Sequence, residues 1–337
     1  MSTVLRVGLA PLAAALLVLY TPGGSTGEPV AIADVELDEV LVIGELPGPA
    51  MWKVSKGDHT LWIMGTLSPL PSKMTWRQKR AEEVIRASGE ILGESSSRWD
   101  MDLGVRESFG MIRTVMKLRH NADGSTLREV LPEAVYQRWH AEHRRWFGKS
   151  PSPKERARPL YAAFLLYDRA LKKSGLTDEP LVWSRAEQLA KQHKVKVRQR
   201  RFTVKVRDPK GMFAELATLP RDLEAACLVE TMDFIDQELP QMKKRAQAWA
   251  VGDMVALRAL PRAELEPQCM ELGEGTRIEQ LSNEEEAMFA RDWSGIVDWL
   301  LLTHETSFTT LPVGKLLADD GVLAQLRSKG YTVEEPQ

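Results

Sequence analysis

Residues 51–66 read MWKVSKGDHTLWIMGT, in which two apolar runs flank the turn-forming residues Gly57 and Asp58. Two short apolar runs joined by a segment that contains glycine are typical of a β-hairpin. The second run leads directly into Gly65-Thr66-Leu67-Ser68, so polar side chains follow the carboxyl end of a strand. We therefore expect the sheet of this protein to begin at this hairpin.

The next elements after the hairpin predict a helix followed by another strand. Thr75 is a suitable N-cap for a helix through Ala87, and the run Glu90-Ile91-Leu92-Gly93 predicts a strand. A strand, helix, strand order suggests a crossover unit and hence a parallel pair. Ligands of open α/β sheets lie beyond the carboxyl ends of strands, which is where Ser68 and Glu94 fall.

The middle of the chain, about residues 100–300, is strongly helical in pattern, whereas the two ends carry most of the predicted strands. Helices are predicted over 132–147, 158–173, 181–193, 222–260 with a break near Gly252, 283–302 and 320–328. Strands are predicted over 35–42, 194–206, 307–311 and 331–333. The pattern predicts an α/β (α+β) fold, a mixed central β-sheet flanked by many helices, in one domain over residues 34–337.

Composition excludes several classes of protein. The chain has 45 basic and 47 acidic residues, a formal net charge of -2, so no global field attracts nucleic acid or an anionic membrane. Its 43% hydrophobic and 27% charged residues are those of an ordinary globular protein. Nucleic acid is therefore not an expected partner.

The N-terminus has the layout of a secretory signal peptide. Arg6 is the only charge before the apolar run Val7–Tyr20, which a Pro-Gly-Gly breaker follows. That run is shorter than the roughly 20 residues of a membrane-spanning helix, which favours a cleaved signal over an anchor. The Ala31-Ile32-Ala33 pattern predicts a signal over residues 1–33, with a rival cleavage site at Ser25-Thr26-Gly27. We expect a periplasmic or secreted protein with no stable membrane span after cleavage.

Two cysteines, Cys227 and Cys269, lie in the part expected to be exported. An oxidising compartment permits a disulfide between them, which would close a loop of about 43 residues and stabilise the fold by roughly 4 kcal/mol. Two separate buried thiols are the alternative. Neither cysteine has the Cys-x-x-Cys spacing of a redox site.

Named catalytic motifs are absent from the sequence: it has no His-Glu-x-x-His, no Gly-x-Ser-x-Gly and no phosphate-binding glycine loop. The six histidines cluster only at His140-Ala141-Glu142-His143, where neighbouring arginines would repel a cation. We interpret this cluster as a solvated helix face. The ten tryptophans are interpreted mainly as core residues, with a glycan-stacking surface as the alternative.

Several segments resemble, in order, motifs of the TraB/GumN family, whose fold is shared with the Tiki metalloproteases. They span nearly the whole chain from Met51 to Val333: Trp52-Lys53-Val54 with Leu61-Trp62-Ile63-Met64-Gly65-Thr66, Ile91-Leu92-Gly93-Glu94, Ala248-Trp249-Ala250-Val251-Gly252-Asp253, Arg291-Asp292, and residues 313–321 with 329–333. The resemblance implies a mixed α/β fold, a site glutamate at Glu94, and a counterpart of the family's Arg-Asn pair at Arg291.

Active members of that family carry histidines in two Gly-x-x-His motifs, and those with the glutamate are thought to bind a divalent metal for peptide hydrolysis. This chain has Ser68 at the first of these positions, and the segment alignment puts Lys315 at the second. A serine hydroxyl is a poor metal ligand, an ammonium adds positive charge, and one carboxylate cannot hold a catalytic metal alone. We therefore expect no metal cofactor.

Two other roles for these residues follow from their chemistry. A Lys315 to Glu94 ion pair could replace the metal structurally. Ser68 could instead act as a nucleophile with Lys315 as its base.

The expected protein is an exported TraB/GumN-like domain with a degenerate site that binds an envelope protein, a peptide or a small ligand. The expected cleft residues are Gly65, Ser68, Glu94, Arg291 and Lys315. The alternatives are a hydrolase with altered or metal-dependent chemistry that acts in the cell envelope, and a scaffold with no function in the cleft.

Overall fold

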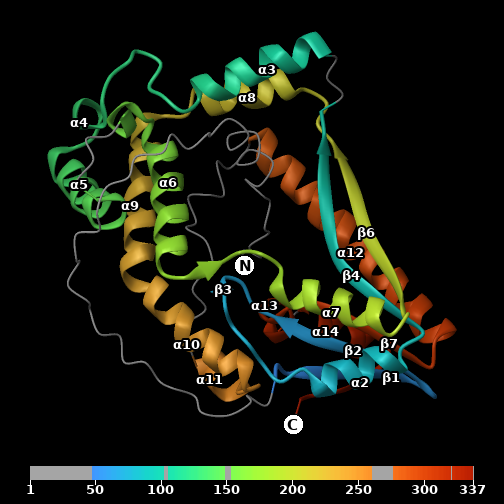
Figure 1. The fold of residues 1–337 in the computed structure, drawn as a ribbon. Coiled ribbons are helices and arrows are strands. Elements are labelled where there is room, and N and C mark those ends of the chain that lie inside the picture. Colours follow the sequence, from blue (N-terminus) through green and yellow to red (C-terminus); the bar gives the residue numbers. More distant parts are fainter. Residues whose placement is uncertain (1–47, 102–104, 149–152, 260–275, 320, 337) are drawn as a thin grey trace.

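The computed structural model describes residues 48–101, 105–148, 153–259, 276–319 and 321–336 (Figure 1). The predicted signal over residues 1–33 and the predicted strand over 35–42 lie outside these ranges, as does Cys269. No helix within them is both long and apolar enough to cross a membrane.

The expected hairpin is present. Strand β1 (Met51–Lys56) pairs antiparallel with β2 (His59–Thr66) in a register that joins Lys56 to His59 across a turn. Gly57 in that turn has φ +57°, a left-handed conformation that glycine adopts without steric cost. The hairpin packs into the core, since Trp52, Val54, Leu61 and Ile63 are fully buried.

Within the described ranges, six strands form the central sheet, in the order β6-β4-β7-β2-β1-β8. The remaining strands are β4 (Glu90–Asp100), β6 (Lys196–Lys205), β7 (Thr306–Pro312) and β8 (Thr332–Glu334). Strand β7 is parallel to both β2 and β4, and β6 is parallel to β4, whereas β1 is antiparallel to its two neighbours. The mixed α/β fold class predicted from the sequence is therefore confirmed.

The predicted crossover pair was only partly right. Strands β2 and β4 do run parallel, but they are not neighbours, because β7 from the C-terminal part of the chain lies between them. Strand β6, from the largely helical middle, forms one edge of the same sheet. Pairings between distant segments decided both features, and local periodicity contains no information about them.

Helices cover both faces of the sheet (Figure 1). Helices α2 (Lys79–Ala87) and α7 (Leu181–Gln192) lie on the face that Trp62 points to, where Arg80 of α2 lies over the Trp62 ring. Gly65, three residues later in β2, faces the opposite side toward α13 (Val313–Leu317). Helices α12 (Arg277–Thr303) and α14 (Val322–Ser328) share that second side.

A separate helical lobe has its own buried cluster of apolar side chains. It contains α4 (Leu127–Val130), α5 (Glu133–Phe147), α6 (Pro159–Lys173) and α9 (Arg221–Gln237). Helix α10 (Leu239–Ala250) and the two-stranded sheet of β3 (Leu70–Pro71) and β5 (Leu176–Thr177) connect this lobe to the central sheet. A third cluster lies around α3 (Val105–Lys117) and α8 (Pro209–Ala217), at the far end of β4 and β6.

Helix starts were predicted less accurately than helix existence. Helix α2 begins at Lys79 rather than after Thr75, because Trp76 is drawn into the core and packs edge-on against Trp249 with ring centroids 5.3 Å apart. Helix α12 begins at Arg277, six residues before the predicted start, where the Thr276 side chain accepts a hydrogen bond from Glu279 N. The predicted break near Gly252 separates α10 from α11 (Met254–Ala259).

Candidate functional site

The carboxyl ends of β2 and β7 lie side by side, where Gly65 pairs with Leu311 and Thr66 with Pro312. Ser68 follows β2 directly, and α13, which carries Lys315, follows β7 directly. The structure therefore brings the segments of three predicted cleft residues, Gly65, Ser68 and Lys315, to one edge of the sheet. This edge is where open α/β sheets place their ligands.

Gly65 is held by contacts that leave little room for a side chain. Its N–H donates to Ala50 O over 3.1 Å, and its carbonyl accepts a hydrogen bond from Trp249 Nε1 over 2.8 Å. A Cβ atom at this position would lie 3.0 Å from the Trp52 ring and 3.5 Å from Val313. The end of β2 is thereby fixed against both the hairpin and α10.

The turn after Trp249 explains how that indole is positioned. Gly252 N donates to Trp249 O and Asp253 N donates to Ala248 O, the two hydrogen bonds of a Schellman motif. Gly252 has φ +69°, and its backbone lies against Gly48, whose N–H donates to Ala250 O over 3.0 Å. The Trp-x-x-Gly-Asp segment is thus a helix end docked beside the site.

Glu94 lies in β4 just beyond the point where the pairing of β4 with β7 ends. The pairing of β4 with β7 ends at Leu92 and Thr309, and the Thr309 hydroxyl donates to Leu92 O over 3.0 Å. On its other side β4 has one residue more than β6 between the pairs Leu92–Arg198 and Ser95–Arg200, which is a β-bulge that contains Glu94. Bulges redirect side chains and are frequent beside functional sites. The Glu94 side chain itself is outside the described part, so its predicted pairing with Lys315 stays a prediction.

Ser68 and Lys315 have different surroundings. The Ser68 hydroxyl is buried and has no hydrogen-bond partner in the described part of the chain. Lys315 is half-buried, and its Nζ lies over the Phe289 ring of α12, 4.3 Å from the centroid. No described contact joins the Ser68 hydroxyl to Lys315, as a nucleophile and its base would require.

Arg291 is exposed on α12, two residues beyond Phe289. The adjacent Asp292 forms an ion pair with Arg200, a buried residue of β6. Burial lowers the pKa of the Arg200 guanidinium to about 10, because desolvation disfavours its charged form. At this turn of α12, Asp292 makes the contact with the sheet while the Arg291 side chain points into solvent.

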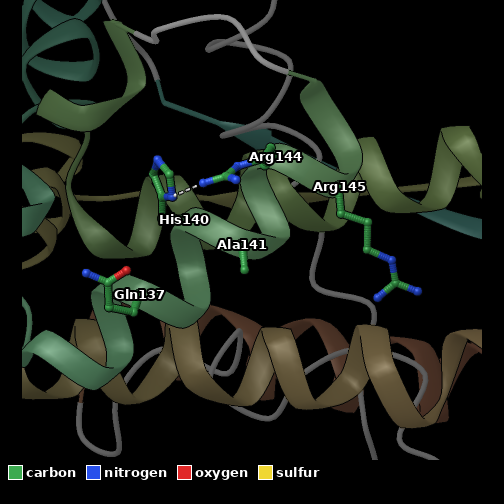
Figure 2. A pocket seen from close by; sticks show the side chains of 5 residues that line it. All are labelled: Gln137, His140, Ala141, Arg144 and Arg145. Atoms are coloured by element: carbon green, nitrogen blue, oxygen red, sulfur yellow. Dashed lines mark hydrogen bonds between the residues drawn. The ribbon is translucent and has the colours of Figure 1, made fainter. Parts of the chain in front are cut away.

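The histidine cluster on α5 divides between two environments, so its interpretation as a wholly solvated face was wrong for His143. That side chain is buried, stacks on Phe147 with centroids 4.7 Å apart and contacts Trp139. His140 instead lines an open hollow of about 450 Å³ together with Arg144, whose Nη2 lies 3.2 Å from His140 Nδ1 (Figure 2). His143 is buried because the Trp139 and Phe147 rings cover it, whereas His140 remains partly exposed.

Metal-binding clusters are absent from the described side chains: no three of their His, Cys, Asp or Glu residues come together. The residues present at the sheet edge do not suit a metal, since Ser68 is a weak ligand and Lys315 is cationic. Of the two cysteines, Cys227 is buried in α9, and its predicted bond to Cys269 stays a prediction because Cys269 is not described.

Three site features were not predicted: the Trp249 hydrogen bond to Gly65 O, the Phe289 ring beneath Lys315, and the buried Trp293 that stacks on Phe289. The i, i+4 spacing of the two aromatic residues on α12 was visible in the sequence. Their relation to Lys315 was not, because it depends on how α12 lies against the end of β7.

In a comparison with protein-family models, residues 50–335 match the TraB/PrgY/gumN family. The match covers the central sheet, the helical lobe and every predicted cleft residue. No curated protein sequence and no solved structure matches the chain significantly.

Proposed function

The chain belongs to the TraB/PrgY/gumN family, and on that premise we propose that it is an exported binding protein whose ligand occupies the carboxyl edge of the sheet. The ligand is an envelope protein, a peptide or a small molecule. In this proposal the protein keeps the fold and the position of the site but does not catalyse metal-dependent hydrolysis.

One observation carries the proposal: the edge where β2 and β7 end presents Ser68 and Lys315 rather than metal ligands. The Lys315 ammonium lies on the Phe289 ring and puts a positive charge beside the site. A bound divalent cation would be repelled by that charge and would receive one weak ligand from Ser68. Binding needs neither a metal nor an activated nucleophile, so it fits these residues best.

A hydrolase with altered chemistry is the second candidate, and the bulge at Glu94 favours it. Bulges are frequent beside active sites, and a glutamate is a common catalytic acid or base. If a metal were held there, Glu94 would be the one carboxylate among the predicted site residues available to ligate it.

Export rests on the sequence of residues 1–33, which have the charge, apolar run and small-residue pattern of a signal peptide. The proposed compartment is the periplasm or the exterior of the cell. A disulfide between Cys227 and Cys269 is part of the same proposal, since oxidising compartments permit it.

Metal content separates the two candidate functions. The full-length protein is purified from the envelope without chelator or nickel affinity steps, and its metals are measured by mass spectrometry beside a Glu94→Ala variant. We expect no stoichiometric zinc or manganese in either protein. Stoichiometric metal in the wild type that disappears in Glu94→Ala would refute the binding proposal and establish a rearranged metal site.

A further inference from the structure

Trp293 has a buried polar atom for which the described part of the chain offers no hydrogen-bond partner. The residue is 4% exposed, and its Nε1 has no partner among the described residues. Nearly all buried polar groups in proteins are hydrogen-bonded, so each exception needs an explanation. An indole N–H can only donate, and it therefore requires an acceptor such as a ligand oxygen.

Phe289 connects Trp293 with Lys315. The Trp293 and Phe289 rings are stacked, with centroids 6.1 Å apart and an interplanar angle of 17°. Lys315 Nζ lies 4.3 Å from the centroid of the same Phe289 ring. An indole donor and an ammonium donor thus border one aromatic ring, close to where β7 ends and α13 begins.

The charges and donors around this ring favour an anion. An ammonium has three N–H donors and no acceptor, so Lys315 can donate to a ligand oxygen in addition to a protein acceptor. Asp292, the residue before Trp293 on α12, forms an ion pair with Arg200. Partial burial strengthens attraction between Lys315 and an anion relative to bulk water.

We propose that Lys315 and Trp293 form a subsite for a carboxylate-bearing ligand, an inference that rests on the proposed binding function. The Lys315 ammonium pairs with the carboxylate, and the Trp293 indole N–H donates to an oxygen of the ligand. The ligand class is an acylated amino acid or the C-terminal end of a peptide, which carries a carboxylate and a carbonyl oxygen close together.

The test uses the full chain with ¹⁵N-labelled tryptophan side chains and follows the indole N–H signals by NMR. N-acetyl-L-alanine is titrated in parallel with its uncharged amide, and the Trp293→Phe variant identifies the Trp293 signal by its loss. We expect the Trp293 signal to shift saturably with the carboxylate but not with the amide. Lys315→Gln should weaken the carboxylate affinity roughly tenfold, the effect of losing one charge-assisted hydrogen bond.

The matched control is Trp146→Phe, which removes an indole N–H that donates to Glu142 in the helical lobe. This variant should leave the titration unchanged. A Trp293 signal that stays still with both probes, or moves equally with both, would overturn the subsite, as would an unaltered affinity in Lys315→Gln. The proposed binding function is instead refuted by metal content, so the two failures are distinguishable.

Discussion

At the scale of single residues, Trp249 connects the linker helix α10 to the end of β2. Its indole N–H donates to Gly65 O over 2.8 Å in the core, while its ring packs on Trp76. A buried carbonyl that loses its side-chain donor retains its desolvation cost, about 1–3 kcal/mol. The position of Ser68, three residues after Gly65, therefore depends on this bond.

Trp249→Phe keeps an aromatic ring but removes the donor. We expect it to lower the free energy of unfolding by about 1–3 kcal/mol more than Trp76→Phe does. Both variants lose ring packing, but only Trp249→Phe leaves the Gly65 carbonyl without its side-chain donor. Urea unfolding followed by circular dichroism measures both. Equal losses in the two variants would show that the hydrogen bond contributes nothing beyond packing.

At the scale of elements, the end of α10 depends on the conformation of one glycine. Gly252 has φ +69°, and a Cβ atom there would lie 3.1 Å from Gly48 O. Gly252 N donates one backbone hydrogen bond of the Schellman motif, and the next residue, Asp253, donates the other. The turn therefore sets where α10 stops and where the chain before β1 docks.

Gly252→Ala should destabilise the protein by about 1–2 kcal/mol, the cost of placing a Cβ in a left-handed conformation. Gly295→Ala is the matched control, since Gly295 lies inside α12, is exposed and has open space around it. It should stabilise the protein by about 0.5–1 kcal/mol through helix propensity. Thermal unfolding measures the stability of both variants. Effects of the same sign in Gly252→Ala and Gly295→Ala would show that the left-handed conformation of Gly252 is not what the alanine disturbs.

At the scale of the whole molecule, the helical lobe and the sheet have separate buried clusters, joined by α10 and by the β3–β5 pair. Cys227 is buried in the lobe cluster on α9. Its predicted bond to Cys269 would constrain the chain between α9 and α12. Such a bond stabilises mainly by reducing the freedom of the unfolded chain.

We expect the protein purified from the envelope to be two hydrogens lighter by intact mass than after reduction. Replacing Cys227 and Cys269 together by serine should lower the free energy of unfolding by up to about 4 kcal/mol. Reduction of the wild type, followed by the same unfolding measurement, serves as the control for side-chain volume. Two titratable thiols in the unreduced protein would rule the bond out.

The sequence by itself determined the local elements and the family, and it predicts that Ser68 and Lys315 stand where the family resemblance implies histidines. Hairpin, helices and strands were predictable because their periodicity and turn residues are encoded within neighbouring positions. The cleft residues came from motif order rather than geometry, and β2, β7 and α13 do bring Gly65, Ser68 and Lys315 to one edge.

Only the tertiary structure decided the strand order, the bulge at Glu94 and the contacts of Trp249 and Trp293. Strand β7 lies between β2 and β4 although more than 200 residues separate it from each along the chain. The burial of His143, beside an exposed neighbouring arginine, likewise depends on which helix covers α5. The physical reason is that packing and long-range pairing select among partners that no local pattern specifies.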